Sequence, residues 1–142
     1  MKLTIAAKDY GCTGTELAAR LREKNIVCEF SDPDYLVLMP ATETGSEGLS
    51  LLKKALLSLP RRPALSEKAP GFCRPERVIS IREASLSPSE IVPAAESAGR
   101  VLAAANVGCP PAVPIVVCGE RIDEAALRCF AYYGIKACTV VQ

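Results

Sequence analysis

The sequence predicts an α/β (α+β) fold made of two halves that a proline-rich connector separates. Short apolar runs of strand length alternate with stretches in which leucine and alanine recur at helical spacing. Hydrophobic residues make up 49% of the 142 residues and charged residues 23%, which suffices for a buried core. Four prolines fall within residues 60–76, where each blocks a helix or a central strand. We therefore expect mixed or parallel sheets covered by helices.

The first half, residues 1–60, is predicted to run β-α-β-β-α. The first helix opens with Thr13-x-x-Glu16, a capping box that satisfies the helix's first free N–H groups. The second helix carries leucines at helical spacing. An Asp-Pro turn makes the two strands beside it antiparallel. The predicted elements are a strand at 2–7, a helix at 14–24, strands at 26–30 and 35–39, and a helix at 46–59.

The connector covers residues 61–76, and the second half, 77–142, is predicted to run β-α-β-α-β. Proline is tolerated at the first position of a helix, so a helix is expected to begin at Pro93 after a loop. Asp123 is expected to cap the next helix and Gly134 to end it. The predicted elements are a strand at 77–81, a loop at 85–92, a helix from 93 to about 105, a strand at 113–117, a helix at 124–133 and a strand at 135–141.

Composition excludes several classes of function. The net charge of +1 offers no basic surface for nucleic acid or for an anionic membrane. No apolar run reaches membrane-spanning length, and the first residues do not resemble a signal peptide, so we expect a soluble cytoplasmic protein. The chain contains no histidine, which removes histidine-dependent triads and the usual metal sites. Its seven cysteines are scattered without a Cys-x-x-Cys pair and are expected to be reduced, buried thiols.

The segment "CPPAVPIVVCGERID" (109–123) sets prolines before an apolar run. Pro110, Pro111 and Pro114 restrict the unfolded backbone and so favour one extended approach. We expect them to fix a strand whose end is a tight turn at Gly119 that exposes Glu120 to solvent.

This segment resembles the Tyr-Pro-Pro-Gly-Ile-Pro…Pro-Gly-Glu signature in the C-terminal domain of bacterial ornithine/lysine/arginine decarboxylases. The stretch "SIREASLSPSEIVPAAESAGRVLAA" (80–104) is similar to the same family's Arg-Glu-Ala and Gly-Arg segments, in the same order. Residues 2–39 resemble the part that follows the family's cofactor domain. The chain departs from the signature at Cys109, which replaces tyrosine, and at Ala112, which replaces glycine.

The resemblance implies that 1–60 is part of the small domain of an aminotransferase-like fold and that 77–142 is the decarboxylase C-terminal domain. The family's enzymes carry pyridoxal phosphate on a lysine that follows a histidine, so this chain is expected to hold no cofactor and no catalytic residue. Its expected partner is the catalytic domain of the parent decarboxylase, which makes a polyamine precursor from a basic amino acid. The full enzyme is expected to be a homodimer.

Four residues are candidates for the wall of the substrate channel: Gly119, Glu120, Arg121 and Thr13. Glu120 could attract a cationic substrate, and Thr13 precedes a helix N-terminus, which favours anions. Gly99 and Arg100 are expected to be structural, with Arg100 paired to Glu83 or Glu96. Two alternatives stay open: a free-standing α/β domain that binds a small molecule or regulates, and an interaction module without a ligand.

Overall fold

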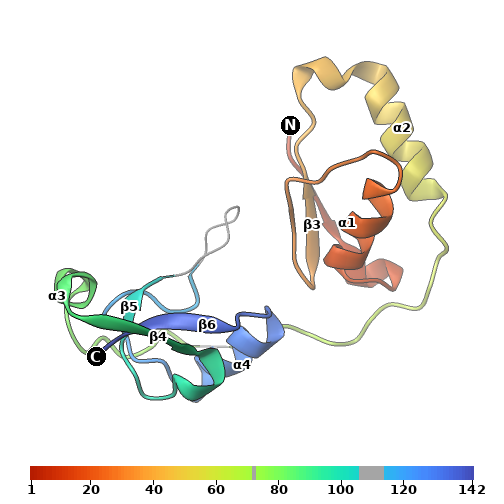
Figure 1. The fold of residues 1–142 in the computed structure, drawn as a ribbon. Coiled ribbons are helices and arrows are strands. Elements are labelled where there is room, and N and C mark those ends of the chain that lie inside the picture. Colours follow the sequence, from red (N-terminus) through yellow and green to blue (C-terminus); the bar gives the residue numbers. More distant parts are fainter. Residues whose placement is uncertain (72, 106–113) are drawn as a thin grey trace. The chain divides into compact units, whose positions relative to one another are not determined.

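The computed structural model describes residues 1–71, 73–105 and 114–142 (Figure 1). The chain divides into two compact units, Met1–Lys68 and Ala69–Gln142, and the boundary falls within the predicted connector. Both units combine helices with a small antiparallel sheet, so the predicted α/β class is confirmed. The expectation of a mixed or parallel sheet is wrong, because every strand pair described is antiparallel.

The first unit follows the predicted β-α-β-β-α order. Its sheet has the order β1-β3-β2, with Leu3 opposite Leu38, and α1 lies against β3 (Figure 1). In place of the predicted strand at 26–30, only the two-residue strand Phe30–Ser31 forms. The elements are β1 (Leu3–Ala6), a 3-10 helix (Ala7–Tyr10), α1 (Gly14–Arg22), β2 (Phe30–Ser31), β3 (Tyr35–Leu38), a second 3-10 helix (Thr42–Thr44) and α2 (Gly45–Leu57).

The core of the first unit forms between the sheet and its two helices. Leu21 of α1 and Leu36 of β3 are fully buried, and Ala55 of α2 joins the same cluster. The helical spacing that predicted α1 and α2 therefore marks the faces that contribute to this core cluster. The other buried members of this cluster are Ala7, Cys12, Leu17 and Leu38.

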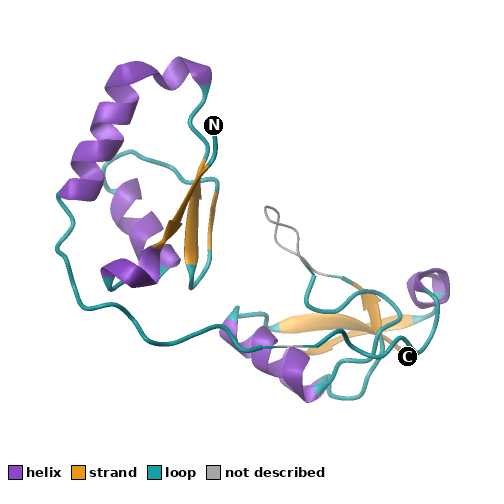
Figure 2. Cartoon of the chain, turned by 180° about the vertical axis from the view of Figure 1, so that it is seen from behind, coloured by secondary structure: helices purple, strands orange, loops and turns teal. Residues whose placement is uncertain are grey.

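The second unit is built on a sheet of order β4-β6-β5, with α4 packed on one face (Figure 2). Its core joins residues of that helix, such as Phe130, to Val140 of β6 and Leu102 of β5. Asp123 caps α4 through its side chain, as predicted, and accepts the N–H of Ala126. The elements are α3 (Ile81–Leu86), β4 (Ser89–Pro93), a 3-10 helix (Ala94–Glu96), β5 (Leu102–Ala104), α4 (Glu124–Tyr132) and β6 (Ala137–Val141).

The predicted strand at 77–81 is wrong, because these residues form no strand and a helix begins at the last of them. The Ser80 hydroxyl accepts the N–H of Glu83 at 3.1 Å, and the Glu83 carboxylate accepts the N–H of Ser80 at 2.9 Å. This capping box starts α3 at Ile81. Only Arg77 forms a bridge, to Glu120.

The predicted loop at 85–92 and the predicted helix from Pro93 are also wrong. The chain forms the edge strand β4, a short 3-10 turn and β5 instead. Alanine-rich sequence favours a helix locally, but pairing with β6 overrides that preference. Pro93 fits at the end of β4, because an outward-facing position of an edge strand needs no N–H donor.

The predicted strand at 113–117 is not found in its described part. Residues 115 and 116 form a bend, and residues 114 and 117 belong to no helix or strand. Pro110 and Pro111 lie outside the described residues. Within the described ranges, no helix is both long enough and apolar enough to cross a membrane.

Candidate functional site

The turn at Gly119 is the first of the sequence-predicted candidates. Gly119 has a φ of 85°, and a Cβ at this position would lie 2.4 Å from the carbonyl oxygen of Ile79. Its own carbonyl accepts the N–H groups of Val78 and Ile79, at 2.9 and 3.2 Å. Glycine is therefore required both by the left-handed backbone and by the close approach of the segment before α3.

Glu120 is buried, with only 3% of its surface exposed, so the expectation of a solvent-exposed carboxylate is wrong. Its Oε2 accepts the backbone N–H of Val117 at 3.0 Å, and its Oε1 lies 3.6 Å from Nε of Arg74. Both carboxylate oxygens thus have partners inside the second unit. The arrangement fixes the turn 117–120 and holds Arg74 beside it, which supports a structural role for Glu120.

Arg121 joins three segments that are distant in sequence. Its Nε lies 3.2 Å from the carboxylate of Glu76, and its Nη1 donates to the carbonyl of Gly99 at 2.9 Å. The backbone N–H of Arg121 also donates to the carbonyl of Glu76. Gly99 itself has a φ of 75°. Gly119, Glu120 and Arg121 therefore form a clasp around residues 74–79, and we call these three residues the clasp turn.

Arg100 makes its contacts within the second unit, and the partners expected for it, Glu83 and Glu96, are wrong. Its Nη2 forms an ion pair with Glu90 at 2.6 Å and donates to the carbonyl of Val141 at 2.8 Å. Glu90 lies on β4 and Val141 on β6, so Arg100 links the two strands at one end of the sheet. The sequence spacing of 10 residues to Glu90 reflects the strand that replaced the predicted helix.

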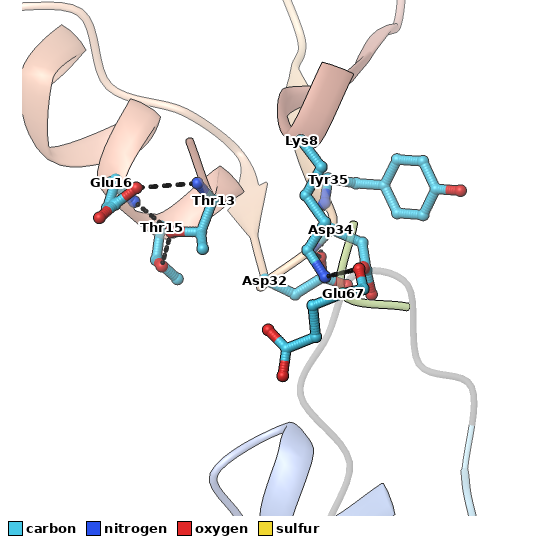
Figure 3. Close-up of polar contacts among 8 residues, drawn as sticks. All are labelled: Lys8, Thr13, Thr15, Glu16, Asp32, Asp34, Tyr35 and Glu67. Atoms are coloured by element: carbon cyan, nitrogen blue, oxygen red, sulfur yellow. Dashed lines mark hydrogen bonds and ion pairs between the residues drawn. The ribbon is translucent and has the colours of Figure 1, made fainter. Parts of the chain in front are cut away.

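Thr13 caps α1, as predicted, and the first N–H groups of that helix are used within the chain (Figure 3). The Thr13 hydroxyl accepts the N–H of Glu16 at 3.1 Å, and the Glu16 carboxylate accepts the N–H of Thr13 at 2.9 Å. The N–H groups of Gly14 and Thr15 donate to the carbonyls of Pro33 and Asp32. A helix start whose donors are occupied in this way does not offer them to an anion.

A buried ion pair in the first unit was missed by the sequence reasoning. Nζ of Lys8 lies 2.9 Å from Oδ1 of Asp34, and the two side chains are 11% and 15% exposed. The same ammonium donates to the carbonyl of Glu67 at 2.7 Å, and the Lys8 carbonyl accepts the N–H of Leu65 at 2.9 Å. Figure 3 shows Lys8, Asp34 and Glu67 converging. We call Lys8 and Asp34 the lysine anchor, because through Lys8 they fix residues 65–67, near the end of the first unit, to its 3-10 helix Ala7–Tyr10.

Two cysteines have altered acidity. Burial raises the pKa of the Cys12 thiol and that of the Cys129 thiol above their usual range. The Cys129 thiol also lies 3.6 Å from the carbonyl of Pro70. A raised pKa keeps both sulfurs protonated near neutral pH, so neither is suited to act as a nucleophile. The part of the chain that the structure describes holds no group of side chains that could bind a metal ion.

The fold and the sequence together define a class: the chain is similar to part of the bacterial decarboxylases of basic amino acids. No family model matches the chain. The resemblance that the sequence motifs predicted is nevertheless confirmed by individual relatives, and solved structures share the fold.

Among the curated relatives, the chain is 32% identical over 133 residues to the arginine decarboxylase of Halalkalibacterium halodurans. It is 33% identical over 137 residues to the arginine decarboxylase of Bacillus anthracis. Each match covers 89% of this chain and 27% of the relative. The chain thus spans about a quarter of the length of the curated relatives it matches.

Two solved lysine decarboxylases share the fold. The Francisella novicida enzyme has a TM-score of 0.65 at 17% identity, over 99% of this chain and 31% of that chain. The constitutive enzyme of E. coli has a TM-score of 0.58 at 16% identity, over 92% of this chain and 28% of that chain.

Proposed function

We propose that this chain is a non-catalytic portion of a pyridoxal-phosphate-dependent decarboxylase that acts on arginine, lysine or ornithine. One observation carries the proposal: nearly nine-tenths of the chain aligns with arginine decarboxylases, yet it spans only 27% of them. In the proposed enzyme, this portion shapes access to the active site and supports contacts between subunits. The rest of the enzyme supplies the chemistry, which releases CO₂ and leaves an amine that serves as a polyamine precursor.

The residues of this chain do not fit pyridoxal phosphate. The chain has no histidine, whereas the related motif sets a histidine before the cofactor lysine. The lysine that is best shielded among those described, Lys8, is held by Asp34 and by the carbonyl of Glu67. Its Nζ is engaged in these two contacts and would have to leave them to form a bond with an aldehyde.

The substrate-channel role of the clasp turn stays a prediction. The carboxylate of Glu120 is engaged by Val117 and Arg74, so its contribution to the enzyme is proposed to be indirect, through the position of residues 74–79. A direct attraction of the cationic substrate would require Glu120 to leave these partners.

The proposal is tested first on the isolated chain. The purified protein is mixed with pyridoxal phosphate, treated with borohydride and weighed by mass spectrometry. We expect no stoichiometric adduct, and no CO₂ from arginine, lysine or ornithine. The Lys8→Met variant is the matched control, because a trace adduct that disappears in it would come from Lys8. One full adduct per chain together with CO₂ release would overturn the proposal.

A further inference from the structure

The two faces of the sheet in the second unit differ in what covers them. On one face, Val92, Cys138 and Val140 pack with α4 into the core. Because side chains alternate along a strand, their neighbours point to the other face. Through the observed register, Ile91 stands opposite Thr139, which is also paired to Ala104. We call this surface the outer sheet face; its residues are Ser89, Ile91, Pro93, Ala104, Ala137, Thr139 and Val141.

The outer sheet face has the composition of a buried surface. It carries no charged side chain, and its largest apolar side chain, Ile91 of the edge strand β4, is 75% exposed. A shallow groove runs over it, lined by Ile91, Ala104, Ala105, Ala137, Cys138 and Thr139. An antiparallel sheet with one face in water normally alternates apolar with polar residues. The sequence Ala-Cys-Thr-Val-Val of β6 does not alternate, and such a strand is typical of a sheet that is covered on both faces.

The size of the outer sheet face limits what can cover it. Three strands of up to five residues present a surface of about 200 Å², from a rise of about 3.3 Å per residue and a strand spacing of about 4.8 Å. A stable complex between separate proteins usually buries about 800 Å² on each partner. A second copy docked on this face alone would therefore bind weakly. A part of the same polypeptide can dock on a much smaller surface, because covalent linkage gives it a high effective concentration at this face.

We propose that the outer sheet face docks the part of the decarboxylase that lies outside the segment this chain spans, through an uncharged, apolar surface of that part. The inference rests on the proposed function and deepens it by naming the contact surface. The matched relatives support the choice of occupant, since 73% of their length, the remainder of the 27% covered, is available to pack there. Ile91 is the anchor of the contact, because it is the largest apolar side chain of this face and is 75% exposed.

The test uses thiol labelling at position 91 in two settings. Ile91→Cys is introduced into the isolated chain, and into a chimera in which this chain replaces the matched segment of the Halalkalibacterium halodurans arginine decarboxylase. Leu86→Cys is the matched control, because Leu86 is also 75% exposed but lies on α3. Labelling is read peptide by peptide by mass spectrometry, so the native cysteines do not interfere.

We expect both introduced thiols to label at similar rates in the dilute isolated chain. In the chimera, labelling at position 91 is expected to slow by about tenfold or more, with position 86 unchanged, because a docked surface opens only transiently. An unchanged rate at 91 in an active chimera overturns the inference and leaves the proposed function standing. Protection at 91 in an inactive chimera supports the inference and counts against the proposed function. Equal protection at both positions overturns the assignment to the outer sheet face.

Other occupants are separate outcomes. Protection at 91 that grows with the concentration of the isolated chain identifies a second copy, and protection in the dilute chain identifies the chain itself; either overturns the inference. If the chimera does not fold, this chain is co-expressed with the Halalkalibacterium halodurans enzyme that lacks the matched segment. Co-purification that Ile91→Lys abolishes and Leu86→Lys preserves supports the inference. Co-purification that is absent, or that Ile91→Lys leaves intact, overturns it.

Discussion

Replacing Lys8 with methionine tests whether the lysine anchor holds the first unit together. The substitution keeps the length of the side chain but removes the ammonium that lies 2.9 Å from Asp34 and 2.7 Å from the carbonyl of Glu67. Both partners lose a donor, and the Asp34 carboxylate, which is 15% exposed, loses its nearest cation. Removing one member of a buried pair costs about 3–5 kcal/mol. Since some solvent reaches this pair, we expect the free energy of unfolding of the first unit to fall by an amount near the lower end of that range, about 3 kcal/mol.

The assay is hydrogen exchange followed by mass spectrometry, because a chain of two units need not unfold in one transition. A loss of about 3 kcal/mol corresponds to about 100-fold faster exchange of the β1 and β3 amides, at about 1.4 kcal/mol per tenfold. The amides of β6, in the second unit, are the internal control and should not change. Tryptic cleavage after Lys68 should also accelerate, because Glu67 is no longer held.

The matched variants separate charge from packing. Lys24→Met removes an exposed lysine of the same unit and should change stability by less than about 0.5 kcal/mol. The double variant Lys8→Met/Asp34→Asn should recover part of the loss, because it also removes the negative charge that Lys8 faces at 2.9 Å. If the β1 amides of Lys8→Met exchange at rates within about twofold of those in the wild type, the reasoning is refuted. The lysine anchor would then contribute little to the stability of the first unit.

The remaining predictions concern the clasp turn, the helix cap and the thiols. Glu120→Ala should destabilise the second unit by about 1–3 kcal/mol, because the part-buried N–H of Val117 loses its acceptor, whereas Glu96→Ala, at an exposed position, should be nearly neutral in chemical denaturation. Thr13→Ala should cost about 1 kcal/mol by loss of the cap, with faster amide exchange confined to the start of α1; a change spread evenly over both units would contradict this. At pH 8, Cys12 should react with iodoacetamide more slowly than exposed Cys73, because burial raises the pKa of Cys12; the reverse order would contradict the assigned burial. Thiol counting under denaturing, non-reducing conditions should find all seven cysteines reduced, and a count of five or fewer would indicate a disulfide.

The sequence predicted the first unit well, because its signals are local. The Thr13–Glu16 box, the leucines of α2 and the turn before β3 each act within a few residues. The second unit was harder. Alanine and valine at 94–105 are compatible with a helix, and only pairing with a strand more than 30 residues later turns this stretch into β5. The Ser80–Glu83 box was visible in the sequence and could have placed α3.

The candidate site was predicted less well than the fold, because burial of charge depends on contacts over long sequence distances. Lys8 meets Glu67 across 59 residues, and no local pattern distinguishes it from a solvated lysine. Glu120 follows a glycine, as an exposed turn residue would, but its oxygens face Val117 and the distant Arg74.

The most direct measurement of the central claim is arginine decarboxylation by the Halalkalibacterium halodurans enzyme in which this chain replaces the matched segment. The control is the same enzyme with that segment deleted. We expect the chimera to release CO₂ from arginine, lysine or ornithine, and the deleted enzyme and the isolated chain to release none. Decarboxylation by the isolated chain with pyridoxal phosphate, or a folded chimera that is inactive on all three amino acids, would contradict it.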